Sequence, residues 1–103
     1  MGKTKKYKDH LIEKLKDPKE ASEYLNACLE DEDPRVFFLA LKDVAEAKGG
    51  MSKLSKESSL NRQTLYRTLS STGNPKMVSV VSILGSLGLE VHIRPTRVSR
   101  QHF

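Results

Sequence analysis

The chain has 103 residues, of which 37% are hydrophobic and 30% are charged, and its formal net charge is +5 at pH 7. This length predicts one domain with a modest core, and no apolar run approaches the roughly 20 residues that a membrane-spanning helix needs. The basic amino-terminal sequence lacks the apolar stretch of a signal peptide, so we expect a cytoplasmic protein with no membrane partner. Cys28 is the only cysteine, which excludes an intramolecular disulfide and a thiolate metal cluster.

The first half of the chain predicts three helices. Leu11, Ile12 and Leu15 indicate a helix over residues 8–16. Asp17-Pro18 and Asp33-Pro34 each place a capping side chain before a proline that suits the first helical position, so helices should follow over residues 18–29 and 34–48. Apolar residues recur at helical spacing in both segments and form the predicted core: Ala21, Tyr24, Leu25 and Cys28 in the first, and Phe37, Phe38, Ala40, Leu41, Val44 and Ala45 in the second.

The acidic run Glu30-Asp31-Glu32-Asp33 lies between the second and third of these helices. We expect a solvated loop whose charge favours the amino end of the next helix. A calcium-binding loop would need a longer set of ligands and a central glycine, and His10, His92 and His102 show no metal-ligand spacing. The sequence therefore predicts no metal site.

Residues 49–75 carry the most informative pattern in the chain. They predict two short helices, over residues 51–58 and 62–70, joined by a tight turn at Ser59 and Leu60, with Asn61 capping the second helix. Four leucines are spaced to be buried: Leu54, Leu60, Leu65 and Leu69. This pattern is typical of a helix-turn-helix, although a helical hairpin in an ordinary bundle, with a solvated polar face, has the same periodicity.

The charge of the chain is divided between two segments. Residues 48–76 carry six basic residues against Glu57 alone, a net charge of +5, whereas residues 17–47 carry nine acidic residues against three basic ones, a net charge of −6. A basic helix pair next to an acidic one is the expected electrostatic footprint of a small DNA-binding protein. This division favours the helix-turn-helix over the plain hairpin.

The exposed side of the second short helix suits the reading of base edges in the major groove of double-stranded DNA. Arginine can bind guanine and glutamine can bind adenine, each through two hydrogen bonds. We therefore expect base contacts from Asn61, Arg62, Gln63, Thr64 and Arg67. Contacts to phosphate, which position the protein without reading the sequence, are expected from Lys53, Lys56, Tyr66 and Lys76.

The last third of the chain predicts one helix and one strand. Gly73 offers a left-handed stop, and Asn74-Pro75 then opens a helix over residues 75–87 whose inward residues are Val78, Val81, Leu84 and Leu87. Residues 89–94 alternate between apolar and polar, as a strand does. Because a lone strand needs a partner, Leu89, Val91 and Ile93 either pair with a second copy in a homodimer or close the monomer's core as an extended tail. Residues 1–6 and 96–103 are expected to be flexible tails.

The sequence resembles repressors of the Cro type and, more narrowly, is similar to the small bacterial addiction-module antidote proteins, the HigA-like antitoxins. The similarity spans about residues 8–94 and lies in four groups: Tyr24-Leu25-Asn26-Ala27 with Leu29, Ala40 to Ala47 with Gly49-Gly50-Met51, Leu65-Tyr66-Arg67 with Leu69, and Gly73-Asn74-Pro75 with Leu87-Gly88-Leu89. Two positions depart from the repressor pattern, since Ser55 replaces an alanine at the helix contact and Ser59 replaces a glycine at the turn. Serine in a left-handed backbone costs about 1 kcal/mol relative to glycine.

This resemblance implies an all-α, lambda-repressor-like helix-turn-helix bundle of five to six helices with one short C-terminal β-strand. It also implies a repressor that binds its own operator and acts as the antitoxin of a type II toxin-antitoxin module, neutralising a RelE/HigB-like ribonuclease toxin. Such a toxin binds RNA and is usually basic, so an acidic surface containing Glu20, Glu23, Glu30 and Glu32 is the expected toxin-binding site. A solvated helix face explains the same acids equally well.

Two other functions stay open at this point. The chain fits a phage-derived or stand-alone transcriptional regulator without a toxin partner, and it also fits a protein-interaction or RNA-binding module. An enzyme is not expected: the serines near Lys53 and Lys56 lack a Ser-x-x-Lys spacing and a glycine-rich elbow, and no nucleotide-binding glycine loop is present. We accordingly expect no cofactor and no small-molecule substrate.

Overall fold

A computed structural model describes residues 5–70 and 75–96 of the chain. Six helices form in this part: α1 (Lys5–Lys14), α2 (Pro18–Leu29), α3 (Pro34–Ala47), α4 (Gly50–Ser58), α5 (Arg62–Thr68) and α6 (Met77–Ser86). The prediction of a helical bundle is confirmed. Among the described residues, no helix is long and apolar enough to cross a membrane.

Aspartate caps begin the two longest helices, as the sequence predicts. Asp17 and Asp33 have extended backbones, and each side chain accepts a hydrogen bond from the backbone N–H two residues later, at 3.0 Å in both cases. Proline occupies the first turn of α2 and of α3. The third predicted cap, Asn74, lies outside the described residues, and α6 begins at Met77 after an extended Lys76 rather than at Pro75.

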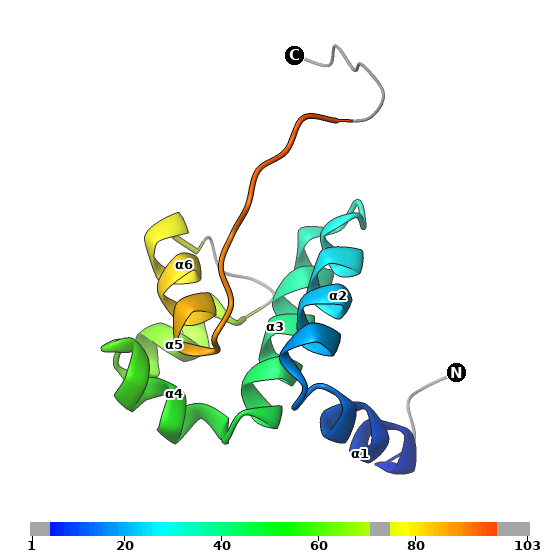
Figure 1. Ribbon diagram of the computed structural model, residues 1–103. Helices are drawn as coiled ribbons and strands as arrows, with labels where there is room; N and C mark the ends of the chain where they lie inside the picture. The colour runs from blue at the N-terminus through cyan, green and yellow to red at the C-terminus, as the bar shows by residue number, and fades with distance from the viewer. Residues whose placement is uncertain (1–4, 71–74, 97–103) are drawn as a thin grey trace.

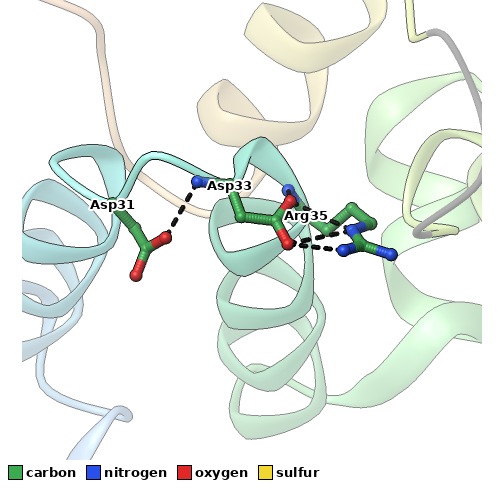
Figure 2. A network of polar contacts seen from close by, with 3 residues as sticks. All are labelled: Asp31, Asp33 and Arg35. Carbon is green, nitrogen blue, oxygen red and sulfur yellow. Dashed lines mark hydrogen bonds and ion pairs between the residues drawn. The ribbon is translucent and has the colours of Figure 1, made fainter.

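The acidic loop between α2 and α3 is ordered by its own side chains. Figure 2 shows that the Asp31 carboxylate accepts a hydrogen bond from the Asp33 N–H at 2.9 Å and that Asp33 binds the Arg35 guanidinium, with its shortest contact at 2.7 Å. The hydrogen bonds that Asp33 accepts from the side chain and backbone of Arg35 hold the pKa of Asp33 below its usual value. Two of the four acids in the run therefore stabilise the loop and the start of α3.

Helix α3 is the centre of the bundle, because it packs against α1, α2 and α4. In Figure 1, α2 and α3 lie side by side as an antiparallel pair, and α4, α5 and α6 form a second group beyond the end of α3. The buried core includes Leu15, Ala21, Leu25, Phe37, Ala40, Leu41, Val44, Ala45 and Ala47 from the first three helices and their turns, with Leu54, Leu65, Leu69, Val80, Ile83, Leu84 and Leu87 from the others. Cys28 is half-buried and packs against this core, as predicted.

Polar contacts fasten α1 and α2 to α3. The Lys8 ammonium lies 3.9 Å from Asp43 and 3.5 Å from Glu46, and the Tyr24 hydroxyl donates a hydrogen bond to Asp43 at 3.1 Å. Burial, followed by the charge of Asp43, raises the pKa of Tyr24. These contacts link three helices through one half-buried carboxylate.

The predicted inward face of α6 is wrong in part. Leu84 and Leu87 are buried, but Val78 is 76% exposed and Val81 is 46% exposed. The buried row is instead Val80, Ile83, Leu84 and Leu87, which follows the i, i+3, i+4, i+7 spacing of one helix face and packs α6 against α4. Apolar residues nearly surround this helix, so periodicity alone does not select the face that its neighbours bury.

The predicted β-strand at Leu89 to Arg94 is not present in the described chain. Gly88 has a positive φ of 81°, which turns the backbone away from α6, and the Leu89 N–H donates to the Leu84 carbonyl at 2.8 Å. Residues 90–95 then form no backbone–backbone hydrogen bond within the described residues. A strand requires a second strand to complete its ladder, and residues 5–70 and 75–96 supply none there, so within this part of the chain the segment is extended but unpaired.

Candidate nucleic-acid interface

The segment from α4 to α5 has the predicted form of two short helices and a tight turn. Ser59 ends α4 in the left-handed conformation, with φ of 64°, and is the one non-glycine residue with positive φ among those described. Asn61 then caps α5, since its side-chain oxygen accepts a hydrogen bond from the Thr64 N–H at 2.8 Å. Leu54, Leu65 and Leu69 are buried and Leu60 is half-buried, so the four leucines hold the two helices against the bundle.

Serine hydroxyls fix the turn in a way that the sequence did not reveal. Ser55 donates to the Leu60 carbonyl at 2.9 Å, and the Leu60 N–H donates to the Ser58 hydroxyl at 3.2 Å. From α6, Ser82 donates to the Ser58 carbonyl at 3.1 Å. Backbone groups in a turn need such partners when they are partly buried. The two serines that depart from the repressor pattern are thus accommodated, one as a hydrogen-bond donor and one as the left-handed residue.

The expected base-reading residues differ in how freely they can meet a ligand. Gln63 and Arg67 are exposed, and Thr64 is half-buried. The oxygen of Asn61 is committed to the cap of α5, which leaves its amide NH2 group for other contacts. Arg62 is exposed, yet its guanidinium donates to the Ser52 hydroxyl at 2.9 Å and so lies back towards α4. The structure therefore joins Arg62 to the first helix of the pair, a contact that periodicity could not indicate.

The expected phosphate-binding residues are all on the surface, and they come from three helices or their ends. Lys53 and Lys56 are exposed on α4, Tyr66 is 52% exposed on α5, and Lys76 is exposed at the start of α6. The stem of Lys53 lies close over Gly49, where an added Cβ would come within 2.7 Å of the lysine Cδ. Gly49 also has φ of 118°. This glycine thus permits both the start of α4 and the position of the Lys53 side chain.

The acidic half of the chain is partly neutralised by α1. Glu20 lies 3.7 Å from the Lys14 ammonium, while Asp43 and Glu46 contact Lys8. Glu23, Glu30 and Glu32 are exposed and make no ion pair within the described part of the chain. Of the expected toxin-binding acids, three therefore keep an uncompensated charge and Glu20 does not.

An apolar groove that the sequence did not predict lies between α2, α3, α6 and the segment after α6. Its volume is about 690 Å³, and its lining includes Leu29, Phe38, Met77, Leu89 and Val91. Asp31 and Glu32 from the acidic loop also reach it. The groove is built from two segments distant in sequence, residues 22–38 and residues 75–92, so no local pattern could have indicated it. Among the described residues, no three His, Cys, Asp or Glu side chains are grouped to hold a metal.

Comparison with known proteins adds a family to this geometry. The family model described as "probable addiction module antidote protein" matches residues 4–95. A protein of Haemophilus influenzae named only as an uncharacterized protein is 32% identical over 95 residues, which cover 91% of this chain and 97% of that relative. No solved structure matches the chain significantly.

Proposed function

The chain belongs to the family of probable addiction module antidote proteins, and from this premise we propose that it is both the antitoxin of a type II module and the repressor of its own operon. An antidote implies a toxin as partner. The DNA-binding role rests on α4 and α5, which we propose to be a Cro-type helix-turn-helix in a single domain. The whole protein then acts by binding rather than by catalysis, in the cytoplasm where operator and toxin both occur.

One observation carries the repressor role: a capped, seven-residue helix presents Gln63 and Arg67 to solvent, with Arg62 at the surface against Ser52, beside a helix that presents Lys53 and Lys56. A helix of this size fits the major groove of B-form DNA with its first residues at the base edges. Arg62 and Gln63 stand in the first turn of α5, so they are the leading base contacts, with Asn61, Thr64 and Arg67 behind them. Lys53, Lys56, Tyr66 and Lys76 bind phosphates in this arrangement.

The toxin is of the RelE/HigB ribonuclease type in this proposal, and it meets the acidic side of the molecule. Glu23, in the middle of α2, and Glu30 and Glu32, at its end and in the following loop, offer uncompensated negative charge. A basic RNA-binding toxin is attracted to such a surface and is masked by it. Because this surface and α5 belong to different segments, toxin and operator can be bound by separate faces.

A homodimer completes the proposal. One helix-turn-helix reads few base pairs, and two copies on a two-fold symmetric site about one helical turn apart gain both affinity and specificity. The apolar side chains that one copy leaves in contact with water are concentrated on α6 and after it: Met77, Val78, Val81, Val91 and Ile93. These residues favour an interface at the carboxy-terminal end of the chain.

The test is a gel shift with the DNA upstream of the protein's own gene, with random DNA of equal length as competitor, at 50 and 200 mM salt. Wild-type protein should prefer the upstream fragment and lose affinity steeply with salt. Replacing Gln63 with Ala should lower the preference about tenfold, because one paired base contact discriminates by roughly 1–3 kcal/mol. Lys53→Gln is the matched control and should weaken binding to both DNAs alike.

Two results would contradict the proposal. A protein that binds neither DNA at low salt is an interaction module rather than a repressor. A protein that binds the upstream fragment but forms no complex with the product of the neighbouring toxin-like gene is a stand-alone regulator.

A further inference from the structure

The segment after α6, residues 89–96, forms an extended C-terminal arm that leaves the bundle between α6 and the α2–α3 pair (Figure 1). Its apolar side chains become progressively more exposed along the chain. Leu89 packs against the core, Val91 lines the apolar groove and is 45% exposed, and Ile93 is 94% exposed. Met77, which lines the same groove, is 64% exposed. The row of apolar residues thus starts in the core and continues into water.

The two faces of the arm are chemically distinct. Glu90 and His92 lie on one side, since the glutamate Oε2 and the histidine Nε2 are 2.7 Å apart. Leu89 packs against the core, and Val91 lies on the same side of the arm as Leu89 because side chains alternate along an extended chain. Residues 90–95 form no backbone–backbone hydrogen bond in the described chain, so one edge is open for pairing.

We infer that the arms of two copies pair antiparallel with the two-fold axis at His92. The inference rests on the homodimer proposed above and gives that dimer its register. In this arrangement His92 lies opposite His92 of the second copy, Val91 lies opposite Ile93, and Glu90 lies opposite Arg94. Symmetry repeats each of the last two pairs, so the dimer contains two apolar pairs on one face and two ion pairs on the other.

Charge selects this register among its neighbours. An axis between two residues would set apolar side chains opposite polar ones, since it reverses the alternation. With the axis at Val91, Glu90 would face His92, whose side chain carries no permanent charge, and Arg94 would face Gly88. With the axis at Ile93, His92 would face Arg94. The axis at His92 alone places each permanently charged side chain opposite one of the opposite sign.

The same register gives the exposed isoleucine a place to bind. A cross-strand neighbour lies about 5 Å away, so Ile93 of the second copy comes beside Val91 at the mouth of the apolar groove. Leu29, 59% exposed, and Met77 line this groove. Each arm therefore removes from water an apolar side chain that its own bundle cannot cover.

Charge exchange tests the ion pairs. Glu90→Arg and Arg94→Glu should each place two like-charged pairs across the axis and raise the dimer dissociation constant at least about tenfold by analytical ultracentrifugation. The two variants mixed should form a heterodimer about as tight as the wild type, because each mutant pairs with the other. The double variant Glu90→Arg/Arg94→Glu should likewise dimerise. Glu90 is exposed and lies outside the core, so the circular dichroism of these variants should equal that of the wild type.

Cysteine cross-linking tests the axis. The variants carry Cys28→Ala, so that the introduced cysteine is the only thiol in each chain. Under mild oxidation His92→Cys should yield a covalent dimer, because directly opposed residues lie within disulfide reach. Val91→Cys and Ile93→Cys are the controls, since each lies diagonal to its own copy at about 7–8 Å. Preferential cross-linking at Val91 or Ile93, or cross-linking at no position, would overturn the register. A mixture of the Glu90→Arg and Arg94→Glu variants that does not associate would overturn it as well.

Neither measurement contains DNA, so the two proposals fail separately. If the His92→Cys variant cross-links but the protein binds no upstream DNA, the proposed repressor function is contradicted and the pairing of the arms is supported. A wild type that stays monomeric at about 50 µM and still binds the upstream fragment tightly would contradict the paired arms. The proposal of a DNA-binding helix would then still stand.

Discussion

The two helix pairs of this molecule, α2–α3 and α4–α5, are held together differently. The first consists of helices of 12 and 14 residues joined along an apolar seam, whereas the second has helices of 9 and 7 residues joined at a turn by serine hydroxyls. A seven-residue helix is not stable alone in water, so α5 depends on Leu65 and Leu69 beneath it and on the cap at Asn61. The long pair supplies stability, and the short pair can leave most of its surface to a ligand.

The largest expected effect breaks the long pair. Leu41 is fully buried in α3, and Leu41→Ala should lower the free energy of unfolding by about 2–5 kcal/mol, through lost burial and the cavity left behind. Urea denaturation measures this loss. Leu39→Ala, on the same helix but at a side chain 52% exposed, is the matched control and should change stability by less than about 0.5 kcal/mol. Equal losses of stability in the two variants would contradict the assignment of Leu41 to the buried face of α3 and of Leu39 to its exposed face.

The next largest effect concerns DNA binding, and it compares lysine substitutions on the α4–α5 pair with lysine substitutions on the α2–α3 pair. Lys53→Gln with Lys56→Gln on α4 should reduce the salt slope of DNA binding by about 2, because each lost phosphate contact removes about 0.9. Binding should then fall about tenfold less than in the wild type between 50 and 200 mM salt. Lys19→Gln with Lys42→Gln, which removes the same charge from exposed positions on α2 and α3, should leave the slope unchanged. A slope that follows total charge, whichever pair is changed, would refute a DNA surface on α4.

Local signals explain how much of both pairs could be predicted. Asp17, Asp33 and Asn61 each satisfy a backbone N–H within three residues, so their helices begin where the sequence indicates. Ser59 likewise adopts the predicted left-handed turn. These features depend on residues that are close together in the sequence, and they can therefore be predicted from it.

What the sequence did not show depends on contacts between segments. The exposed positions of Val78 and Val81 follow from the packing of α6 on α4, which an almost uniformly apolar helix does not encode. The bond from Ser82 to the turn, the contact between Arg62 and Ser52, and the pairing of Glu20 with Lys14 each join residues from different helices or turns. The roles given to the polar side chains of α5 and of the acidic loop remain predictions for the same reason, since each requires a second molecule.

A smaller effect concerns the acidic side of the long pair. Glu30→Lys with Glu32→Lys should slow association with the toxin roughly tenfold at low salt, because complementary charge mainly accelerates encounter. DNA binding should stay close to the wild-type value. Asp9→Lys with Glu13→Lys changes the same amount of charge on α1 and is the control. Stopped-flow association at two salt concentrations measures both, and an on-rate indifferent to Glu30, Glu32 and salt would leave the acids as a solvated face.

The smallest effect lies in the turn of the short pair. Ser59 has φ of 64°, a region that costs a residue with a Cβ about 1 kcal/mol relative to glycine, while glycine itself loses more backbone entropy on folding. Ser59→Gly should therefore raise the free energy of unfolding by no more than about 1 kcal/mol. Glu57→Gly, at an exposed position inside α4 with an ordinary helical backbone, should instead lower it by about 0.5–1 kcal/mol. Urea denaturation of the two variants gives opposite signs if the strain belongs to the turn. A loss of stability in Ser59→Gly would mean that the serine hydroxyl contributes more there than the left-handed backbone costs.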